Sequence, residues 1–172
     1  VNIDQISLQK LRNAITVIPQ DPQLFEGTLR ENVDLLGEYK DSEIMEALEA
    51  VNTSKKFEGI DMQVKSGGEN FSAGERQMIC IARALLKKSR VILIDEATSN
   101  IDLNNEEVFL QTIKRRFSDS TVVTIAHRLN TIRNSDKIVV MDQGRVAEIG
   151  SPEDLLKQEN GVFAQMWNKL DR

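Results

Sequence analysis

The sequence of 172 residues has few of the features that mark secreted, membrane-spanning or nucleic-acid-binding proteins. Its single cysteine, Cys80, excludes an internal disulfide and is typical of a reducing compartment. The longest apolar runs, "VILI" and "KIVVM", are far shorter than the ~20 residues that cross a bilayer. The formal net charge of −5 argues against a general nucleic-acid binder, because phosphate backbones are bound by basic surfaces. The remaining composition, 40% hydrophobic and 28% charged, indicates one globular domain.

Strand and helix patterns alternate along the chain. Strands are expected at 14–18, 91–94 and 121–126; helices are expected from Thr28, over 41–51, after Ser72, over 103–117 and from Ser151; a loop is expected over 52–70 and a hairpin turn near Gly144. The strands at 91–94 and 121–126 are apolar on both faces, as is typical of strands buried inside a parallel sheet. This alternation predicts an α/β domain with a mostly parallel sheet.

Two adjacent carboxylates, Asp95 and Glu96, directly follow the strand "VILI". Sheets of this kind place their chemistry at the carboxyl ends of the strands, and His127 follows another strand, "TVVTIA". A carboxylate in this position can hold Mg²⁺ opposite nucleotide phosphates, and a second one can orient or deprotonate a water. The alternative is that Glu96 begins a turn and Asp95 caps the peptide groups after it.

The stretch "FSAGERQ" begins a helix, where free backbone N–H groups and the helix dipole suit an anion. Ser72 with Glu75 also reads as a capping box, and that alone could explain both residues. Two further residues are candidates because of where they stand. A lone histidine would usually be structural, but His127 follows a strand end beside the strand of the acids. A lone Gln20 would usually belong to a surface loop, but just past the strand at 14–18 it could ligate a metal or hold a water. The apolar pair Leu24–Phe25 in a polar loop indicates either a partner surface or an anchor into the core.

Together and in this order, the motifs resemble the nucleotide-binding domain of ATP-binding cassette (ABC) transporters. The resemblance covers nearly the whole chain: "VIPQDPQLFEGTLRENV" is similar to the Q-loop region, "GGENFSAGERQ" to the signature motif, "VILIDE" to Walker B with its catalytic glutamate, "SNID" to the D-loop, and "TIAHRLNTI" to the switch-histidine loop. The wording of "QDPQLFEGTLRENVD" and "ENFSAGERQ" is closest to the second cassette of the multidrug-resistance-associated, or C, subfamily of exporters.

The resemblance implies ATP and Mg²⁺ as ligands and a role for each matching residue. Gln20 would contact Mg²⁺ and the attacking water, Asp95 would support Mg²⁺, Glu96 would act as general base, and His127 would hold the γ-phosphate. The remaining residues would face a second cassette: Ser72, Ala73, Gly74 and Glu75 at its ATP, and Asp102 as a bridge between the cassettes. Closure of the paired cassettes would drive the transmembrane domains, which places the protein at the cytoplasmic face of a membrane.

The signature motif departs from the family's LSGGQ, with Phe71, Ala73 and Glu75 in place of leucine, the first glycine and glutamine. If the backbone at 73 needs a positive φ, alanine strains it by roughly 1–2 kcal/mol; if not, the change is harmless. Glu75 adds negative charge near a phosphate, although the helix dipole partly offsets it.

A phosphate cradle requires G-x-x-x-x-G-K-[ST], and no two glycines of this chain stand five apart. The chain also starts without methionine, which suggests a piece of a longer protein. The resemblance therefore predicts a P-loop NTPase-like sheet with helices and a helical signature subdomain, lacking its N-terminal part. Residues 1–172 would form a partial cassette, with the Q-loop and helical region at about 20–75 and the Walker B, D-loop, switch-histidine and C-terminal parts at about 76–172.

Three functions are compatible with these motifs. The first is the ATPase domain of a membrane exporter, favoured by "PQLFEGTLREN", which is similar to the exporter type of Q-loop. The second is a soluble ABC-type ATPase acting on DNA or ribosomes. The third is a degenerate regulatory cassette that binds nucleotide without turnover, against which the presence of Glu96 and His127 argues.

Overall fold

The computed structural model describes residues 2–51, 56–97, 103–125, 129–158 and 160–170. Asp102 and His127, two of the candidate residues, lie outside these ranges. The chain divides into two compact units, residues 1–125 and 126–172. Within the ranges that the structure describes, no helix has both the length and the apolar character needed to cross a membrane.

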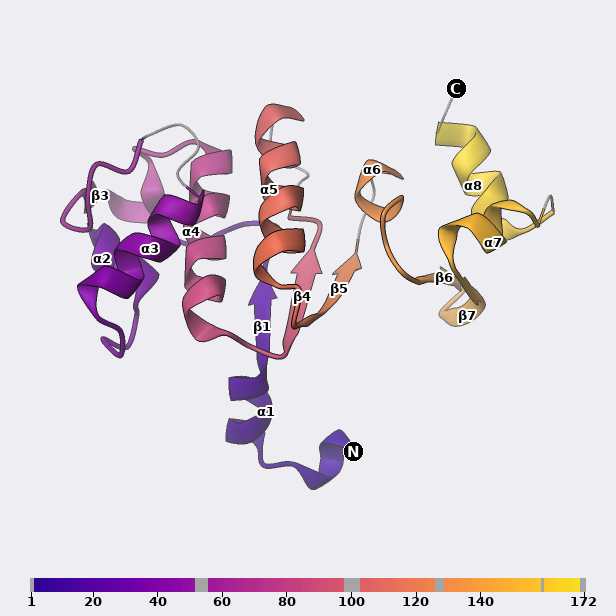
Figure 1. Ribbon diagram of the computed structural model, residues 1–172, viewed down its shortest axis with the longest axis horizontal. Coiled ribbons are helices and arrows are strands. Elements are labelled where there is room, and N and C mark those ends of the chain that lie inside the picture. The colour runs from indigo at the N-terminus through magenta and orange to yellow at the C-terminus, as the bar shows by residue number, and fades with distance from the viewer. Residues whose placement is uncertain (1, 52–55, 98–102, 126–128, 159, 171–172) are drawn as a thin grey trace. The chain divides into compact units, whose positions relative to one another are not determined.

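The first unit is built on a parallel sheet of three strands in the order β1-β4-β5 (Figure 1). The strands are β1 (Ile15–Ile18), β4 (Val91–Asp95) and β5 (Thr121–Ile125). Ile18 pairs with Ile94, and Asp95 pairs with Ile125, so the strands end close together at one edge. This confirms the α/β fold expected from the sequence and places the apolar strand β4 in the centre of the sheet.

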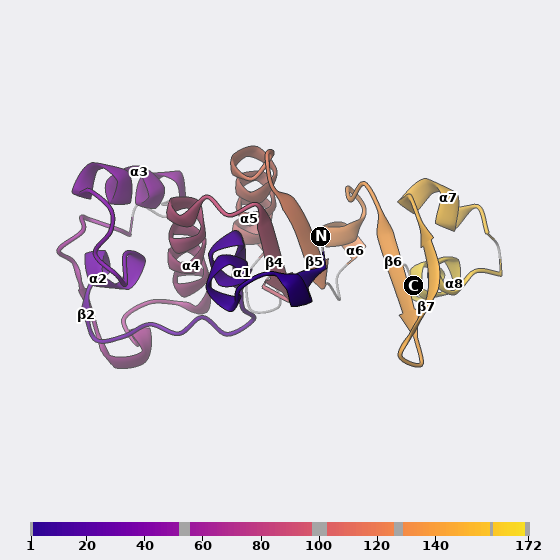
Figure 2. The same ribbon diagram turned by 90° about the horizontal axis from the view of Figure 1, so that it is seen from below.

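Two long helices, α4 (Ala73–Lys87) and α5 (Leu103–Arg116), lie on one side of this sheet (Figures 1 and 2). Side chains from this face of the sheet and from the helices are buried in one core that includes Ile18, Ile92, Ile79 and Phe109, none of them more than 1% exposed. Helix α4 is apolar along most of its length because it packs against both the sheet and the neighbouring helices.

The opposite face of the sheet is largely open. Val17, Val123 and Ile125 point to it and are 58%, 49% and 59% exposed. The sequence analysis expected 121–126 to be a buried strand, and this expectation is wrong for β5, which lies at the edge of the sheet with alternating exposure. The reason is that an apolar strand is buried only if something covers both faces, and the described residues of this unit cover one.

Before the sheet, η1 (Ile3–Gln5) leads into α1 (Leu8–Ala14), a helix that the sequence analysis did not predict. Helix α1 begins at the cap Ser7, whose hydroxyl accepts a hydrogen bond from the Lys10 amide at 3.4 Å. Lys87 Nζ, at the end of α4, donates hydrogen bonds to the carbonyl oxygens of Arg12 and Ile15, each at 2.7 Å. This side chain ties α4 to the start of β1.

A small helical region follows β1. It contains β2 (Gly27–Thr28), α2 (Leu29–Val33), α3 (Asp41–Val51), β3 (Gln63–Val64) and η2 (Ser66–Gly68). The expected capping box is confirmed, because the Thr28 hydroxyl accepts from the Glu31 amide at 3.2 Å and the Glu31 carboxylate accepts from the Thr28 amide at 2.7 Å. The prediction of a loop over 52–70 is partly wrong, because β3 lies in this range and pairs with β2 in an antiparallel ladder. The pairing joins segments that are far apart in the sequence, so no local pattern indicates it.

The second unit contains α6 (Leu129–Ile132), the hairpin of β6 (Ile138–Asp142) and β7 (Arg145–Gly150), and the helices α7 (Pro152–Leu156) and α8 (Val162–Leu170). The predicted hairpin turn is confirmed at Gln143 and Gly144, which both have positive φ. The predicted Ser151 cap is also confirmed, since its hydroxyl accepts from the Asp154 amide at 3.1 Å. Ile138, Val140, Leu155 and Phe163 form a separate small core.

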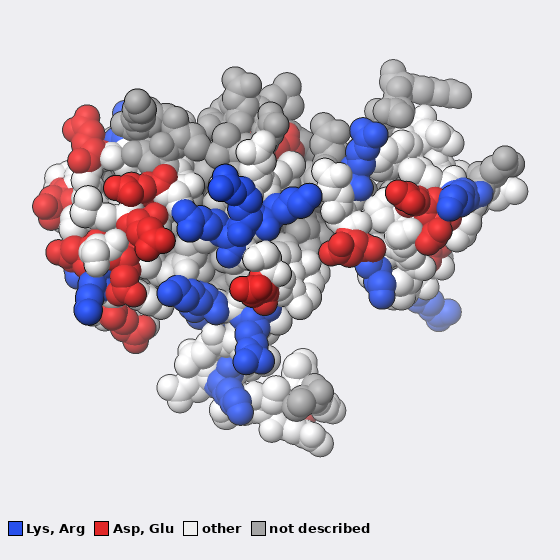
Figure 3. Space-filling model, in the orientation of Figure 1, with Lys and Arg blue, Asp and Glu red and all other residues white. Residues whose placement is uncertain are grey.

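Charges segregate on the side of the first unit seen in Figure 3, with acidic side chains gathered to one side of basic ones. The exposed acids of α3 are Asp41, Glu43, Glu46 and Glu49, and the exposed bases near the ends of α4 and α5 are Lys87, Lys88, Arg90, Lys114, Arg115 and Arg116. A cleft of about 490 Å³ lies among residues of both sets, including Glu46 and Arg116, whose charged atoms are 3.9 Å apart. Because Arg90 and Ser120 precede β4 and β5, this cleft lies at the amino ends of the strands.

Candidate functional site

The candidate site lies at the opposite edge, where the three parallel strands end. Gln20 follows β1 by two residues, Asp95 ends β4, and Glu96 comes next. The pairing of Ile18 with Ile94 and of Asp95 with Ile125 brings these three chain ends together in the order of the sheet. The register of the sheet therefore brings the chain positions of Gln20, Asp95 and Glu96 to one edge.

Glu96 has a backbone conformation that is unusual for its residue type. Its φ is 45°, in the left-handed region that side chains other than glycine rarely adopt. Its amide donates a hydrogen bond to the carbonyl oxygen of Ile125 at 3.0 Å, which holds this turn against the end of β5. The side chain is half-buried, and the next residue, Ala97, is 3% exposed. Strained backbone of this kind costs on the order of 1–3 kcal/mol and often marks a functional position.

Asp95 and Gln20 have the chemistry and the exposure to share a divalent cation. Both side chains are exposed at neighbouring strand ends. Mg²⁺ is usually bound through one or two carboxylates together with waters and substrate phosphates, so a complete cage of protein ligands is not required. The described residues contain no group of three His, Cys, Asp or Glu side chains placed to hold a metal on their own.

The signature motif begins α4, here called the signature helix. The Ser72 hydroxyl accepts from the Glu75 amide at 3.2 Å, and the Glu75 carboxylate accepts from the Ser72 amide at 2.8 Å. The capping box considered from the sequence is thus present. The capping box uses the amides of Ser72 and Glu75. The amides of Ala73 and Gly74 also lie in the first turn, where backbone amides have no acceptor within the helix. Ser72 is exposed and Ala73 is half-buried, whereas Gly74 is buried, so a ligand can reach this helix end at Ser72.

The alanine in the signature motif carries no backbone strain. Ala73 is the first residue of α4, and it is not among the described residues with positive φ, which apart from glycine are Lys88, Glu96 and Gln143. Of the two possibilities left open by the sequence, the structure supports the harmless one. The departure from the family motif that matters electrostatically is therefore Glu75.

Gln77, which the sequence analysis did not single out, connects the signature helix to the Q-loop. Its side chain is 1% exposed, and Nε2 donates a hydrogen bond to the carbonyl oxygen of Pro19 at 3.1 Å. Pro19 directly precedes Gln20. One signal in the sequence could have identified Gln77, namely a polar residue on the buried face of an apolar helix. Such a group requires a hydrogen-bond partner when it is buried.

The apolar pair at 24–25 divides into one core residue and one surface residue. Leu24 is 3% exposed, whereas Phe25 is 58% exposed. Leu24 packs so closely on Gly68, in the loop before the signature motif, that a Cβ on Gly68 would lie 2.8 Å from Leu24 Cδ1. The reading as a core anchor is confirmed for Leu24, and the exposed Phe25 leaves the partner surface a prediction.

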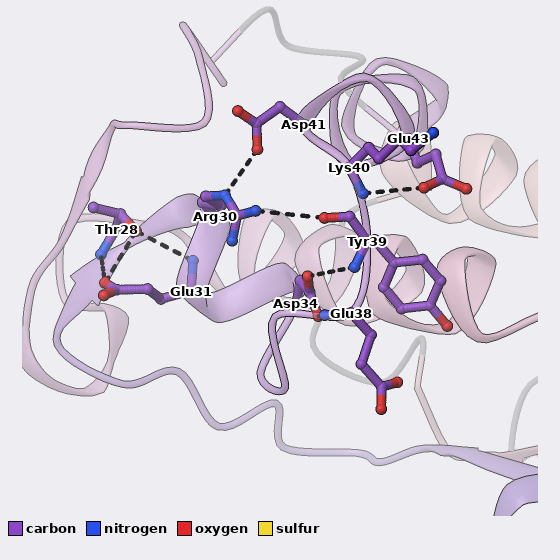
Figure 4. Close-up of polar contacts among 9 residues, drawn as sticks. All are labelled: Thr28, Arg30, Glu31, Asp34, Glu38, Tyr39, Lys40, Asp41 and Glu43. Atoms are coloured by element: carbon purple, nitrogen blue, oxygen red, sulfur yellow. Dashed lines mark hydrogen bonds and ion pairs between the residues drawn. The ribbon is translucent and has the colours of Figure 1, made fainter.

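Asp34 organises the turn between α2 and α3 (Figure 4). Leu35 and Leu36, in this turn, are exposed. The Asp34 carboxylate is 6% exposed and accepts hydrogen bonds from the amides of Glu38 and Tyr39 at 3.1 and 2.9 Å. Burial acts to raise the pKa of Asp34, but these backbone hydrogen bonds and the nearby positive charge of Arg30 outweigh it, so its pKa lies below the usual value.

Arg30 completes this arrangement from α2. Its Nε donates to Asp41 Oδ1 at 2.9 Å, and its Nη2 donates to the carbonyl oxygen of Tyr39 at 3.4 Å (Figure 4). The sequence carried no signal for these contacts beyond the charges themselves, because the partners lie nine and eleven residues away.

Comparison with protein families gives one match relevant to this site. The model of the family described as "ABC transporter" matches residues 1–99, which include Gln20, the signature motif, Asp95 and Glu96.

Curated proteins similar to this chain include ATP-binding cassette sub-family C member 3 of Mus musculus, which is 48% identical over 170 residues, 96% of this chain and 11% of that protein. ABC transporter C family member 12 of Dictyostelium discoideum is 45% identical over 172 residues, 98% of this chain and 13% of that protein. Metal resistance protein YCF1 of Saccharomyces cerevisiae is 45% identical over 168 residues, 95% of this chain and 11% of that protein. The chain spans about a tenth of the length of these relatives.

Among solved structures, a bacterial Atm1-family ABC exporter with ATP bound is similar to this chain with a TM-score of 0.89. The two sequences are 36% identical, and the alignment covers 99% of this chain and 31% of the exporter chain.

Proposed function

The chain belongs to the ABC transporter family, and on that premise we propose that it is the C-terminal portion of an ATP-hydrolysing cassette that drives a membrane exporter. The observation that carries this proposal is the meeting of Gln20, Asp95 and Glu96 at one edge of the sheet, with Glu96 bonded to the end of the strand that leads to His127. The relatives named as C-family transporters favour the exporter over a soluble ABC-type ATPase.

Glu96 acts as the general base in this proposal. Its positive φ turns the chain out of β4, and the hydrogen bond from its backbone amide to the carbonyl oxygen of Ile125 fixes the position of this turn. A carboxylate held in this way can accept a proton from the water that attacks the γ-phosphate. His127, two residues beyond Ile125, would contact the γ-phosphate and orient Glu96.

Gln20 and Asp95 hold the substrate's metal and the water in place. When bound with ATP, Mg²⁺ would neutralise charge on the β- and γ-phosphates. The exposed Asp95 carboxylate at the end of β4 would support it, and the exposed side-chain amide of Gln20, just past β1, would be a second ligand. Since the carbonyl group of the preceding Pro19 is bonded to Gln77, the position of Gln20 depends on the signature helix.

The signature helix faces a second cassette in this proposal. Ser72 and the first-turn amides of Ala73 and Gly74 would bind the γ-phosphate of an ATP held mainly by that partner, and Asp102 would bridge the two cassettes. The exposed N-terminus of α4 suits such a contact because its amides and dipole attract an anion. Opening and closing of the pair would be transmitted to transmembrane domains.

In this proposal the phosphate-binding loop belongs to a part of the protein other than these 172 residues, which contain no G-x-x-x-x-G-K-[ST]. The open face of the sheet, with Val17, Val123 and Ile125 exposed, supports the same view. An apolar face of this kind is stable when another layer packs on it.

The experiment that tests the function is ATP hydrolysis by the complete protein with Glu96→Gln. The variant is expected to bind ATP as the wild type does and to lose at least about 100-fold in kcat, the typical contribution of a general base. Glu49→Gln, at an exposed position on α3, is the matched control and should hydrolyse ATP normally.

Two results would contradict this function. Full turnover by the Glu96→Gln variant would remove Glu96 from the mechanism. ATP binding without turnover by the wild type would instead support the degenerate regulatory cassette.

A further inference from the structure

The segment from Gln23 to Phe25 is held to the signature helix by Arg83. This side chain comes from the last part of α4, and its Nη1 donates a hydrogen bond to the carbonyl oxygen of Gln23 at 2.9 Å. Its Nε and Nη2 donate to the carbonyl oxygen and to the side-chain oxygen of Asn32 in α2. One guanidinium therefore contacts two segments that are 51 and 60 residues away in the sequence.

Asn32 holds the other side of the same segment. It is 1% exposed, and its Oδ1 accepts from the amide of Phe25 at 2.9 Å. Its Nδ2 donates to the carbonyl oxygens of Phe25 at 2.8 Å and of Thr28 at 3.0 Å. Both backbone polar groups of Phe25 are thus bonded by one buried side chain, whose own hydrogen-bonding capacity is satisfied.

Apolar packing adds a further contact between this segment and the signature region. Leu24 and the methylene part of Arg76 both lie against Gly68, so closely that a Cβ on Gly68 would come within 2.8 Å of Leu24 and 2.9 Å of Arg76. At the start of the Q-loop, Gln77 holds Pro19. The signature helix therefore forms hydrogen bonds with the chain on both sides of Gln20, at Pro19 and at Gln23.

We propose that Arg83 and Asn32 are positioning residues that make segment 23–25 move with the signature helix, so that ATP contact at Ser72 repositions the exposed Phe25. This inference rests on the proposed function, which supplies the ATP at Ser72. Arg83 lies eleven residues along α4 from Ser72, or about 16 Å, a distance over which a helix behaves as a rigid rod. Moving α4 without the segment would break the hydrogen bonds that Arg83 donates to Gln23 and Asn32 and would leave these groups without that donor.

The test is amide hydrogen exchange in the complete protein carrying Glu96→Gln, with and without Mg·ATP. In this background ATP is expected to slow exchange about tenfold in both segments 72–76 and 23–27. Adding Arg83→Met, which keeps the aliphatic length and removes every donor, should preserve the slowing at 72–76 and reduce it at 23–27 to less than about twofold.

Lys87→Met is the matched control. Lys87 lies on the same helix and also bridges to backbone carbonyl oxygens, those of Arg12 and Ile15, but it does not contact the Q-loop segment. Both segments should still respond to ATP in this variant. A second variant, Asn32→Asp, keeps an acceptor for the Phe25 amide and for Arg83 while it removes the donor to the Phe25 carbonyl group. It should also weaken the response at 23–27, and it serves if Arg83→Met does not fold.

Three results would overturn the proposal. If segment 23–27 still responds to ATP in Arg83→Met and Asn32→Asp, the two segments are not linked through these residues. If Lys87→Met loses the response equally, the effect is general loosening of α4. If ATP leaves exchange at 72–76 unchanged in the parent protein, the proposed function fails, and the linkage fails with it.

Discussion

The amide of Glu96 donates a hydrogen bond to the carbonyl oxygen of Ile125 at 3.0 Å, which joins the end of β4 to the end of β5. Ile125 is also the ladder partner of Asp95. The two strands therefore end at the same place, one with the acids and the other two residues before His127. The roles proposed for Glu96 and His127 lead to a direct test.

We expect Glu96→Gln and His127→Ala to be strongly non-additive. If both side chains act in one hydrolytic step, the double variant should lose about as much kcat as the worse single variant, because residues that work as a unit do not contribute independently. Steady-state ATPase kinetics of the complete protein measure this. Losses that multiply would show that the two residues act at separate places.

Gly68→Ala should destabilise the signature region more than Gly67→Ala. Both glycines have positive φ, +73° and +63°, so alanine strains either position by roughly 1–2 kcal/mol. Only at Gly68 would the new Cβ also overlap Leu24, at 2.8 Å, whereas nothing lies within 4 Å at Gly67. We expect about 1–3 kcal/mol of additional destabilisation at Gly68 from this overpacking. Thermal unfolding of the complete protein compares the two variants. Equal decreases in Tm would contradict the close contact between Gly68 and Leu24.

The turn held by Asp34 should loosen in acid. A carboxyl whose folded pKa lies below its unfolded value contributes stability above the unfolded pKa, about 3.9, and loses it as pH falls through the folded pKa. Amide exchange of Glu38 and Tyr39, corrected for the intrinsic rate at each pH, should therefore show steady protection from pH 7 to about 5 and falling protection below about 4.

Asp34→Asn is the control for this titration. It keeps the shape and one acceptor but cannot ionise, so protection should be lower at pH 7, by on the order of 1–2 kcal/mol, and nearly independent of pH. The amide of Arg76, which donates to Ser72 in α4, reports whether acid loosens the whole unit. Protection of Glu38 and Tyr39 that falls equally in both proteins would exclude Asp34 as the cause.

Glu75→Gln should strengthen the contact of the signature motif with ATP. Glutamine can replace glutamate in the capping box with Ser72, so the helix start should persist while a negative charge near the phosphate is removed. The KM for ATP in the complete protein is expected to fall about two- to fivefold, the effect of one charge at a helix N-terminus. Ser72→Ala should raise it, and an unchanged KM in both variants would place the motif away from the phosphate.

The 172-residue chain on its own is expected neither to bind ATP tightly nor to hydrolyse it. It lacks the phosphate-loop motif, and its sheet leaves Val17, Val123 and Ile125 exposed. Its thermal unfolding should therefore be broad, and Val123→Thr with Ile125→Thr should reduce aggregation without loss of structure. Turnover that Glu96→Gln abolishes, or a sharp cooperative transition, would each contradict this expectation.

The sequence by itself determined the features whose signals lie within a few residues of one another. The capping boxes at Thr28 and Ser72, the hairpin turn near Gly144 and the central strand β4 are all present as predicted. The positions of Asp95 and Glu96 followed from the same local pattern, because a buried parallel strand has its functional end at its carboxyl terminus.

Only the tertiary structure decided which side chains are covered and which distant groups meet. Leu24 is buried and its neighbour Phe25 exposed, although both are apolar. Gln77 contacts Pro19, and Arg83 contacts Gln23 and Asn32, across 51 to 60 residues of sequence, so no periodicity or motif could identify these contacts. The physical reason is that a hydrogen bond or a close apolar contact depends on how elements pack, whereas sequence patterns report what each element prefers on its own.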